Sequence, residues 1–300
     1  MATTNPVVTS IQNYVNENSE ALYVKAVLGG KSAGMFALAP DVKGATAIHL
    51  MDTDVVLQDG KACGWTESGS TTFSNRVITP AILKVNQGFC DKNLLGTYAA
   101  YKVRLAAGSE QLPFEEKWVK SIIDAVNAKI ERMIYQGDKD NGNAVECDGF
   151  IKILNDESTT VKVNSVAGTS AYEFVKAVAK AIPATVKNPA ILISTPMYRE
   201  FMQDIVAANL YHFAPAEGEN EYKLPGTDIR VIGVDGLNGT QKAIAANLEN
   251  LVYGCDAEGS EAQFDLWYSK DNREFRLVIE LAVGVQVAFP QEVVLGTRAE

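Results

Sequence analysis

Residues 113–136, PFEEKWVKSIIDAVNAKIERMIYQ, carry the strongest structural signal in the chain. Apolar residues recur at every fourth position, with a second set beside them: Phe114, Trp118, Ile122, Val126 and Ile130, then Val119, Ile123 and Met133. This spacing predicts one apolar stripe along a helix. Pro113 stands at the expected first position and Gly137 lies just beyond the end, as in ordinary helices. At 1.5 Å per residue the helix would span about 36 Å, so we expect it to be the spine of a domain.

The sequence before this helix predicts an arm and a long hairpin. Residues 1–35 are polar, with a weakly helical stretch at Ile11–Ala26 before Gly29-Gly30. Thr46–Leu57 and Arg76–Val85 are β-prone, and the Gly-, Ser- and Thr-rich segment Gln58–Asn75 separates them. A lone two-stranded ribbon is barely stable in water. We therefore expect this ribbon to lie on something else, and a neighbouring subunit is one candidate.

The sequence after the helix alternates between the two kinds of element. The β-prone stretches are Gly149–Leu154, Thr159–Asn164, Ala190–Ser194, Asp228–Val234, Lys242–Ala245, Gln263–Ser269, Glu274–Leu281 and Val283–Phe289. Ser170 with Glu173 forms a capping box that opens a helix stopped by Pro183. Thr195-Pro196 caps and starts another helix that reaches about Asn209. The expected class is α+β.

Composition excludes several classes of protein. The chain has 300 residues, 47% of them hydrophobic, and 37 acidic against 27 basic residues give a net charge of −10. Tight binding of phosphate backbones needs clustered Lys and Arg, which this balance argues against. The four cysteines form no C-x-x-C pair, so neither a zinc ribbon nor a disulfide scaffold is predicted. No apolar leader and no run of about 18 apolar residues is present, so we expect no membrane partner and synthesis in the cytoplasm.

Motifs of catalysis and phosphate binding are weak in this sequence. Gly30-Lys31-Ser32 is similar to the end of a phosphate-binding loop, but the required first glycine would fall at Lys25. The two histidines, His49 and His212, lie in separate segments, which removes most triad and general-base arrangements. We predict no catalytic residue and no cofactor.

Two groups of residues could suggest a metal site, and each has a plainer interpretation. Asp138, Asp140 and Glu146 have the wrong spacing for a calcium loop, and a solvated turn is preferred. His49 with Cys63 and Cys90 could hold a metal across the hairpin, but packed thiols and a strand histidine are preferred. We predict no metal site.

Four local phrases and the order of the elements carry a resemblance to a known family. The phrases are Tyr135-Gln136-Gly137-Asp138, Cys147–Leu154, Asn188–Pro196 and Leu251–Asp256. An arm, a two-stranded extension, a spine helix, a β segment, a small α/β lobe and a return to β strands cover nearly the whole chain. Together they resemble the major capsid protein of tailed bacteriophages, with the Hong Kong 97-like capsid fold.

The resemblance implies a division of the chain. The expected parts are an N-terminal arm at 1–35, an extended β-hairpin loop at 36–92, a peripheral domain formed by 93–166 and 258–300 with the spine helix at 113–136, and an α/β axial domain at 167–257. Many relatives begin with a cleaved scaffolding segment, whereas here the arm starts almost at Met1. The scaffold is then expected as a separate chain, unless this is the mature form. We identify no Lys/Asn pair for crosslinking.

The resemblance also implies a function. Pentamers and hexamers would tile an icosahedral head shell around a double-stranded DNA genome, in a virion made in the bacterial cytoplasm. Scaffold, portal and decoration proteins are the implied partners, and packaged DNA would lie nearby without sequence-specific binding. A bacterial nanocompartment shell with the same fold is the first alternative. A small α/β metabolic enzyme built on Ser170–Val234 is the second.

Three residues of the ribbon are predicted to contact other subunits. Trp65 and Phe73 lie near the expected tip, and Arg76 begins the returning strand. Aromatic and arginine side chains tend to dominate protein interfaces, which is why these three are chosen.

Overall fold

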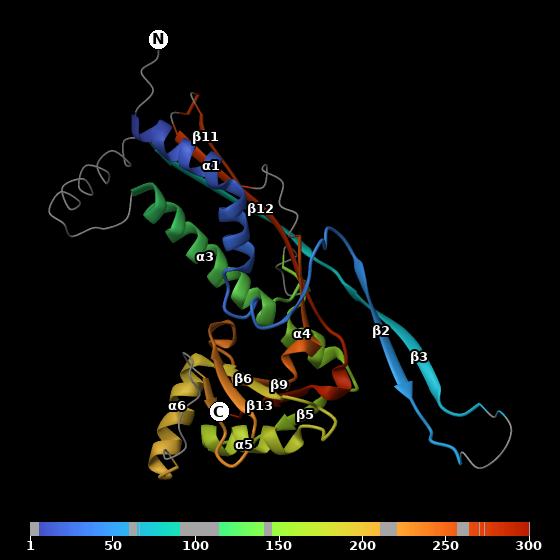
Figure 1. The fold of residues 1–300 in the computed structure, drawn as a ribbon. Coiled ribbons are helices and arrows are strands. Elements are labelled where there is room, and N and C mark those ends of the chain that lie inside the picture. The colour runs from blue at the N-terminus through green and yellow to red at the C-terminus, as the bar shows by residue number, and fades with distance from the viewer. Residues whose placement is uncertain are drawn as a thin grey trace.

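The computed structural model describes residues 6–59, 65, 67–90, 114–140, 146–210, 221–256, 264–269, 271–272 and 274–299. Its helices are α1 (Pro6–Leu28), α3 (Phe114–Gln136), α4 (Phe150–Asp156), α5 (Ala171–Ala181) and α6 (Thr195–Ala207), with 3-10 turns η1 (Asp235–Leu237), η2 (Leu248–Asn250) and η4 (Pro290–Glu292). Two sheets and a separate hairpin make an elongated molecule, with the hairpin extending away from both sheets (Figure 1).

One sheet has five strands arranged around β12. Its strands are β1 (Ala37–Ala39), β4 (Ala81–Cys90), β10 (Leu251–Cys255), β11 (Phe264–Ser269) and β12 (Glu274–Val287). β10 and β11 both pair antiparallel with β12, and β4 pairs antiparallel along Glu274–Val283 of the same strand. The 14-residue β12 therefore holds this sheet together.

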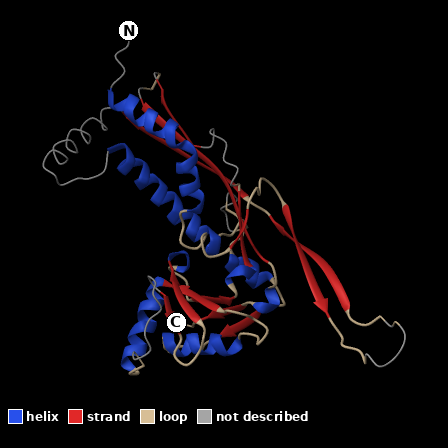
Figure 2. Ribbon diagram, in the orientation of Figure 1, coloured by secondary structure: helices blue, strands red, loops and turns tan. Residues whose placement is uncertain are grey.

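The other sheet has six strands in the order β5-β13-β9-β6-β8-β7. Their bounds are β5 (Val161–Asn164), β6 (Ala190–Ser194), β7 (Glu221–Lys223), β8 (Arg230–Val234), β9 (Lys242–Ala246) and β13 (Val294–Thr297). α5 and α6 pack against it (Figure 2). As predicted, the Ser170 hydroxyl accepts a hydrogen bond from the Glu173 amide and α5 ends before Pro183. The cap of α6 is Ser194 and not Thr195, because the Ser194 hydroxyl accepts from Met197.

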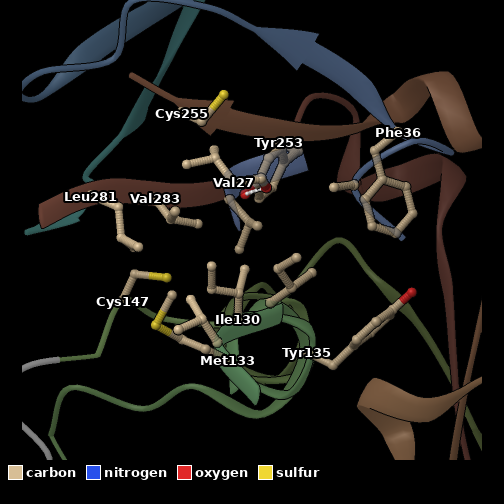
Figure 3. Packing of buried hydrophobic residues seen from close by; sticks show 14 of the residues in the cluster. Val27, Phe36, Ile130, Met133, Tyr135, Cys147, Tyr253, Cys255, Leu281 and Val283 are labelled. Atoms are coloured by element: carbon tan, nitrogen blue, oxygen red, sulfur yellow. Dashed lines mark hydrogen bonds between the residues drawn. The ribbon is translucent and has the colours of Figure 1, made fainter. Parts of the chain in front are cut away.

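The predicted spine helix is α3, and it ends at Gln136 as expected; Pro113, its expected first residue, lies outside the described residues. From Val119 to Met133 the apolar stripe of α3 is buried in the main core together with residues of α1, β10 and β12, and the partly buried Trp118 packs against that core (Figure 3). Phe36, Tyr135 and Phe150 meet edge to face, with ring centroids 5.3–6.2 Å apart. The turn η1 of the six-stranded sheet lies against the same helix, so α3 joins the two bodies.

The hairpin consists of β2 (Thr46–Asp54) and β3 (Ser70–Ile78), paired antiparallel. No other described strand pairs with either of them. The sequence predicted a second strand running from Arg76 to Val85, and this prediction is wrong. Pro80 has no N–H to donate to a ladder, so β3 ends at Ile78 and β4 begins at Ala81 in the five-stranded sheet. The segment between the hairpin strands is therefore 55–69 and not 58–75.

Two other predicted elements are corrected. Gly149–Leu154 belongs to helix α4 and is not a strand, because Phe150 and Leu154 stand four residues apart and both turn into the core. The two strands predicted on either side of Ala282 are one strand, β12, because Ala282 itself pairs with Ile82 in β4.

The predicted domain limits differ from the sheets at five strands. β1 and β4 fall in the range assigned to the extended loop, but they pair with β10 and β12 in the five-stranded sheet. β5 and β13 fall in the ranges assigned to the peripheral domain, but they pair with each other and with β9 in the six-stranded sheet. β10 falls in the axial range, but it pairs with β12. Pairing between segments far apart in sequence decides these memberships, and β13 was not predicted at all.

Gly236 tests the contact between η1 and α3. A Cβ at this position would lie closer than van der Waals contact to the Glu131 carbonyl oxygen and the Tyr135 ring. We expect Gly236→Ala to lower the free energy of unfolding by about 1–3 kcal/mol in urea titrations, because a packed contact must shift. In Gly44→Ala, where nothing lies within 4 Å, the change should stay within about 0.5 kcal/mol. Equal stabilities of the two variants would contradict this account of the junction.

Candidate assembly surface

The hairpin has two unlike faces. Met51 pairs directly with Phe73, and both side chains stand on the outer face, 63% and 77% exposed. Ile48 and Ile78 are an odd number of residues away, so the alternation of the pleat turns them to the opposite face, toward the body of the protein. Ile78 is fully buried. The outer face therefore presents apolar side chains that nothing in the described chain covers.

The segment that follows β2 continues this apolar surface. Val55, Val56 and Leu57 are consecutive and exposed, and Leu57 is 93% exposed. Trp65 is 86% exposed. Monomeric proteins rarely expose contiguous apolar groups in this number, and such patches mark interaction sites. Trp65 lies in the segment between the strands, as predicted, whereas Phe73 lies within β3 and not in the tip segment. The exposed Met51 and the run 55–57 were missed, although three apolar residues in an otherwise polar segment were the signal.

Arg76 lies at the base of the hairpin and not near its tip. Its guanidinium forms an ion pair with Glu157, which follows α4 in the same chain. Gln286 of β12 donates a hydrogen bond of 2.7 Å to the carbonyl oxygen of Val77. Below these contacts Ile78 packs with Val42, as part of a small core that also includes Val252 and Ala288. The structure thus gives Arg76 an intramolecular partner, and its role here is to fasten the hairpin.

The N-terminal segment is not a free arm over its described length. Leu22, Tyr23 and Val27 of α1 are buried in the main core. The Tyr23 hydroxyl donates to the carbonyl oxygen of Asp256 at 2.8 Å, and the Tyr253 hydroxyl donates to that of Val27 at 2.9 Å (Figure 3). This part of the chain gains its burial within its own subunit, because α1 lies against α3 and β11.

The Gly30-Lys31-Ser32 sequence has a structural role. The Ser32 hydroxyl and amide both donate to the Glu131 carboxyl on α3. Lys31 donates through its ammonium group to the carbonyl oxygen of Gly233 at 3.0 Å. Turns and not a helix follow the motif. Burial raises the pKa of Glu131, and burial likewise holds the pKa of Tyr135 well above its ordinary value. Through these contacts the turn holds the C-terminal end of α1 against α3 and against β8 of the six-stranded sheet.

The acidic turn after α3 is paired with lysines. Carboxylate oxygens of Asp138, Asp140 and Asp148 lie within 4.8 Å of one another, whereas Glu146 is outside the group. The Lys152 ammonium lies 3.7 Å from Asp138 and 3.3 Å from Asp140. Lys139 lies 3.0 Å from Asp148. The two lysines therefore already offset negative charge of the carboxylates, which is what a bound cation would otherwise do.

The second metal arrangement is not assembled. His49 is hydrogen-bonded through Nδ1 to Asn75 at 2.8 Å on the outer face of the hairpin. Cys90 ends β4, which belongs to another sheet. It lies nine residues beyond Ala81, so its backbone is about 30 Å from that of Ala81. Cys63 and His212 lie outside the described residues.

The chain exposes a large surface for its mass. Its accessible surface is 16836 Å², about 40% more than the roughly 12,000 Å² that scaling gives for a compact monomer of 32.4 kDa. The hairpin in Figure 1 shows one source of the excess. None of the helices in the described part of the chain is long and apolar enough to cross a membrane.

Comparisons with known proteins give one consistent result. No protein-family model matches the sequence, and no curated protein matches it. Solved structures do match. A chain of Gordonia phage Cozz aligns with a TM-score of 0.61 at 10% identity, covering 90% of this chain and 86% of that one. A chain of the satellite phage P4 procapsid with size determination protein aligns with a TM-score of 0.59 at 8% identity, covering 93% and 98%.

A third solved structure comes from a different kind of organism. A virus-like particle from Pyrococcus furiosus aligns with a TM-score of 0.52 at 10% identity and covers 97% of this chain and 99% of that one. These likenesses cover nearly the whole length on both sides. The chain therefore has the capsid-subunit fold of tailed phages, which is the Hong Kong 97-like fold that the resemblance implied.

Substitutions on the two faces of the hairpin should affect the stability of the subunit differently. Ile78→Ala is expected to lower the free energy of unfolding of the isolated subunit by about 2–5 kcal/mol, because a fully buried side chain leaves a cavity. Phe73→Ser should change it by no more than about 0.5 kcal/mol, because the ring is already in water. Chemical denaturation of both variants measures the difference. A large loss in Phe73→Ser would show that the outer face is covered within the subunit.

The buried thiols predict a dependence on pH. Burial raises the pKa of Cys147 to about 12 and that of Cys255 to about 11. In the unfolded chain a thiol has a pKa of about 8.5. The stabilisation by the two protonated thiols is therefore complete below pH 8.5 and is lost as the pH rises through 11–12. In a Cys63→Ser/Cys90→Ser background, both thiols should resist a maleimide at pH 8 until urea unfolds the chain. Rapid labelling of the folded protein would contradict this.

Proposed function

We propose that this chain is a major capsid protein that assembles, as pentamers and hexamers, into the icosahedral head shell of a tailed phage. The observation that carries the proposal is the outer face of the hairpin, whose apolar side chains have no cover in the described chain. The capsid-subunit fold supports it independently. The exposed apolar side chains of the hairpin and of the segment after β2 are those of Met51, Val55, Val56, Leu57, Trp65 and Phe73. Burying these six would contribute on the order of 10 kcal/mol per subunit before ordering costs are subtracted.

In the proposed shell each subunit uses its parts differently. The body around the six-stranded sheet is the axial domain, and it meets its copies around five-fold and six-fold centres. The body around α3 and the five-stranded sheet is the peripheral domain, and the hairpin is the extended loop that overlies a neighbour. Contacts of this kind are head to tail, and rings form where the rotation closes.

The proposed contents and partners follow from the class. A net charge of −10 suits a shell that surrounds DNA without gripping it, because strong phosphate binding would obstruct packaging and release. Double-stranded DNA is the proposed cargo. Separate scaffold, portal and decoration proteins are the proposed partners, and the virion is the proposed location after synthesis in the host cytoplasm.

A nanocompartment shell is the second candidate. The likeness to the virus-like particle from Pyrococcus furiosus, which extends over 97% of this chain, favours keeping it. The two candidates differ in what the particle encloses. Nucleic acid in particles isolated from an infected culture supports the phage shell, and a packaged enzyme supports the nanocompartment.

Trp65 is the residue that tests the proposed role of the hairpin. We expect the purified wild-type chain to form particles of megadalton mass by light scattering and closed shells by electron microscopy. Trp65→Ala should reduce the yield of shells and leave the free energy of unfolding of the subunit unchanged, because the indole is exposed in the subunit.

Val166→Ala is the matched control, since it shortens an equally exposed side chain away from the hairpin. Shells that form normally in Trp65→Ala would remove Trp65 from the interface. A wild-type chain that stays a small oligomer at high concentration, with and without scaffold, would contradict the proposed function itself.

A further inference from the structure

An apolar groove runs between α3 and β4. It has a volume of about 410 Å³ and an apolar lining. Ile122, Val126 and Met133 of α3 form one wall, and Leu83 and Val85 of β4 form the other. The β4 side chains are only half-buried. A groove of this size would hold two or three aliphatic side chains, as sites for small ligands do.

Positive charges border this groove. Lys84 of β4 and Lys129 and Arg132 of α3 line it and are exposed, whereas Glu146 is the single acidic residue among its lining residues. Lys84 is also paired with Glu280 at 2.9 Å. The rim is therefore basic on a protein whose net charge is −10, which makes it distinct from the average surface. An occupant with apolar side chains between acidic ones would fit it.

The edge of β4 adds a second means of binding. β4 pairs with β12 on one side, and no other described strand pairs with it. A free edge presents backbone N–H and C=O groups that an extended segment can pair with. An extended occupant could thus lie along β4 while its side chains enter the groove.

The chain itself contains a segment with the required chemistry. Residues 54–59 read DVVLQD, so three exposed apolar residues stand between Asp54 and Asp59. They follow β2 and have no regular secondary structure. In Figure 1 the hairpin extends from the body in the direction opposite to β4 and α3, so this segment cannot reach the groove of its own subunit.

We infer that the groove between α3 and β4 receives residues 54–59 of a second copy of this chain. Because successive side chains of an extended strand point to opposite faces, Val55 and Leu57 enter the groove, and the two flanking aspartates face Lys129 and Arg132 on its rim. The inference rests on the proposed function, because it names the surface on which the hairpin of one subunit lies on the next.

Disulfide trapping between two singly substituted chains tests this contact. In a Cys63→Ser/Cys90→Ser background, one chain carries Leu57→Cys and a differently tagged chain carries Ala125→Cys, an exposed residue on the groove wall. The two are mixed, assembled and mildly oxidised. A disulfide forms only where the two Cα atoms come within about 7 Å. Val166→Cys replaces Leu57→Cys in the control, since its side chain is also exposed but lies elsewhere.

The expected result is a crosslinked heterodimer in assembled particles, at least roughly tenfold more abundant than in the Val166→Cys control. Shells that form without this crosslink, and also without one to Gln87→Cys on the β4 wall, would overturn the inference and leave the proposed function standing. Crosslinking in small oligomers that never close into shells would support the groove contact and contradict the proposed function.

Exchange of charges gives a second, independent readout. Asp54→Lys/Asp59→Lys and Lys129→Glu/Arg132→Glu should each reduce the yield of shells severalfold, because like charges then face each other. Shells of the chain that carries all four substitutions should recover, since the pairs are restored with reversed sign. Two sets of losses that simply add in the combined variant would overturn the pairing. Unfolding curves of the isolated subunits control for misfolding.

Discussion

The constraint on which this structure depends is the isolation of its hairpin. β2 and β3 pair with each other and with no other described strand, and their outer face presents Met51 and Phe73 to water. A two-stranded ribbon of this kind is marginal alone. Within the described residues nothing covers its apolar face, so in the proposed shell completion of the fold and association of subunits are partly one process.

Contacts at its base fasten that ribbon to the rest of the subunit. Arg76 with Glu157 and the core around Ile78 fasten the base of the hairpin, and Pro80 passes the chain directly into β4 of the five-stranded sheet. The sheet rests on α3, and α3 also contacts η1 of the six-stranded sheet. A load on the hairpin is thus transmitted through packed elements to both bodies, as the proposed role in a shell would require.

The sequence predicted those elements whose signals are local. The stripe and caps of 113–136, the capping box at Ser170 and the apolar run Ala190–Ser194 each specify their own element. Pairing between distant segments is not written locally, which is why β13, the continuity of β12 and the sheet of β10 were missed. Trp65 and Phe73 were chosen from residue type alone; both are exposed in the subunit, and their contact with another subunit stays a prediction. The intramolecular ion pair of Arg76 was not foreseen, because its partner, Glu157, lies 81 residues away. The groove between α3 and β4 required the packed structure.

Backbone hydrogen exchange measured on free subunits and on assembled particles tests the central claim most directly. If neighbouring copies cover the hairpin, amides of 46–57 and 70–78 exchange quickly in the subunit and become strongly protected in the particle, while those of β6 are protected in both. Equal exchange of the hairpin amides before and after assembly would contradict the account, because the apolar outer face would then remain in water in the finished shell.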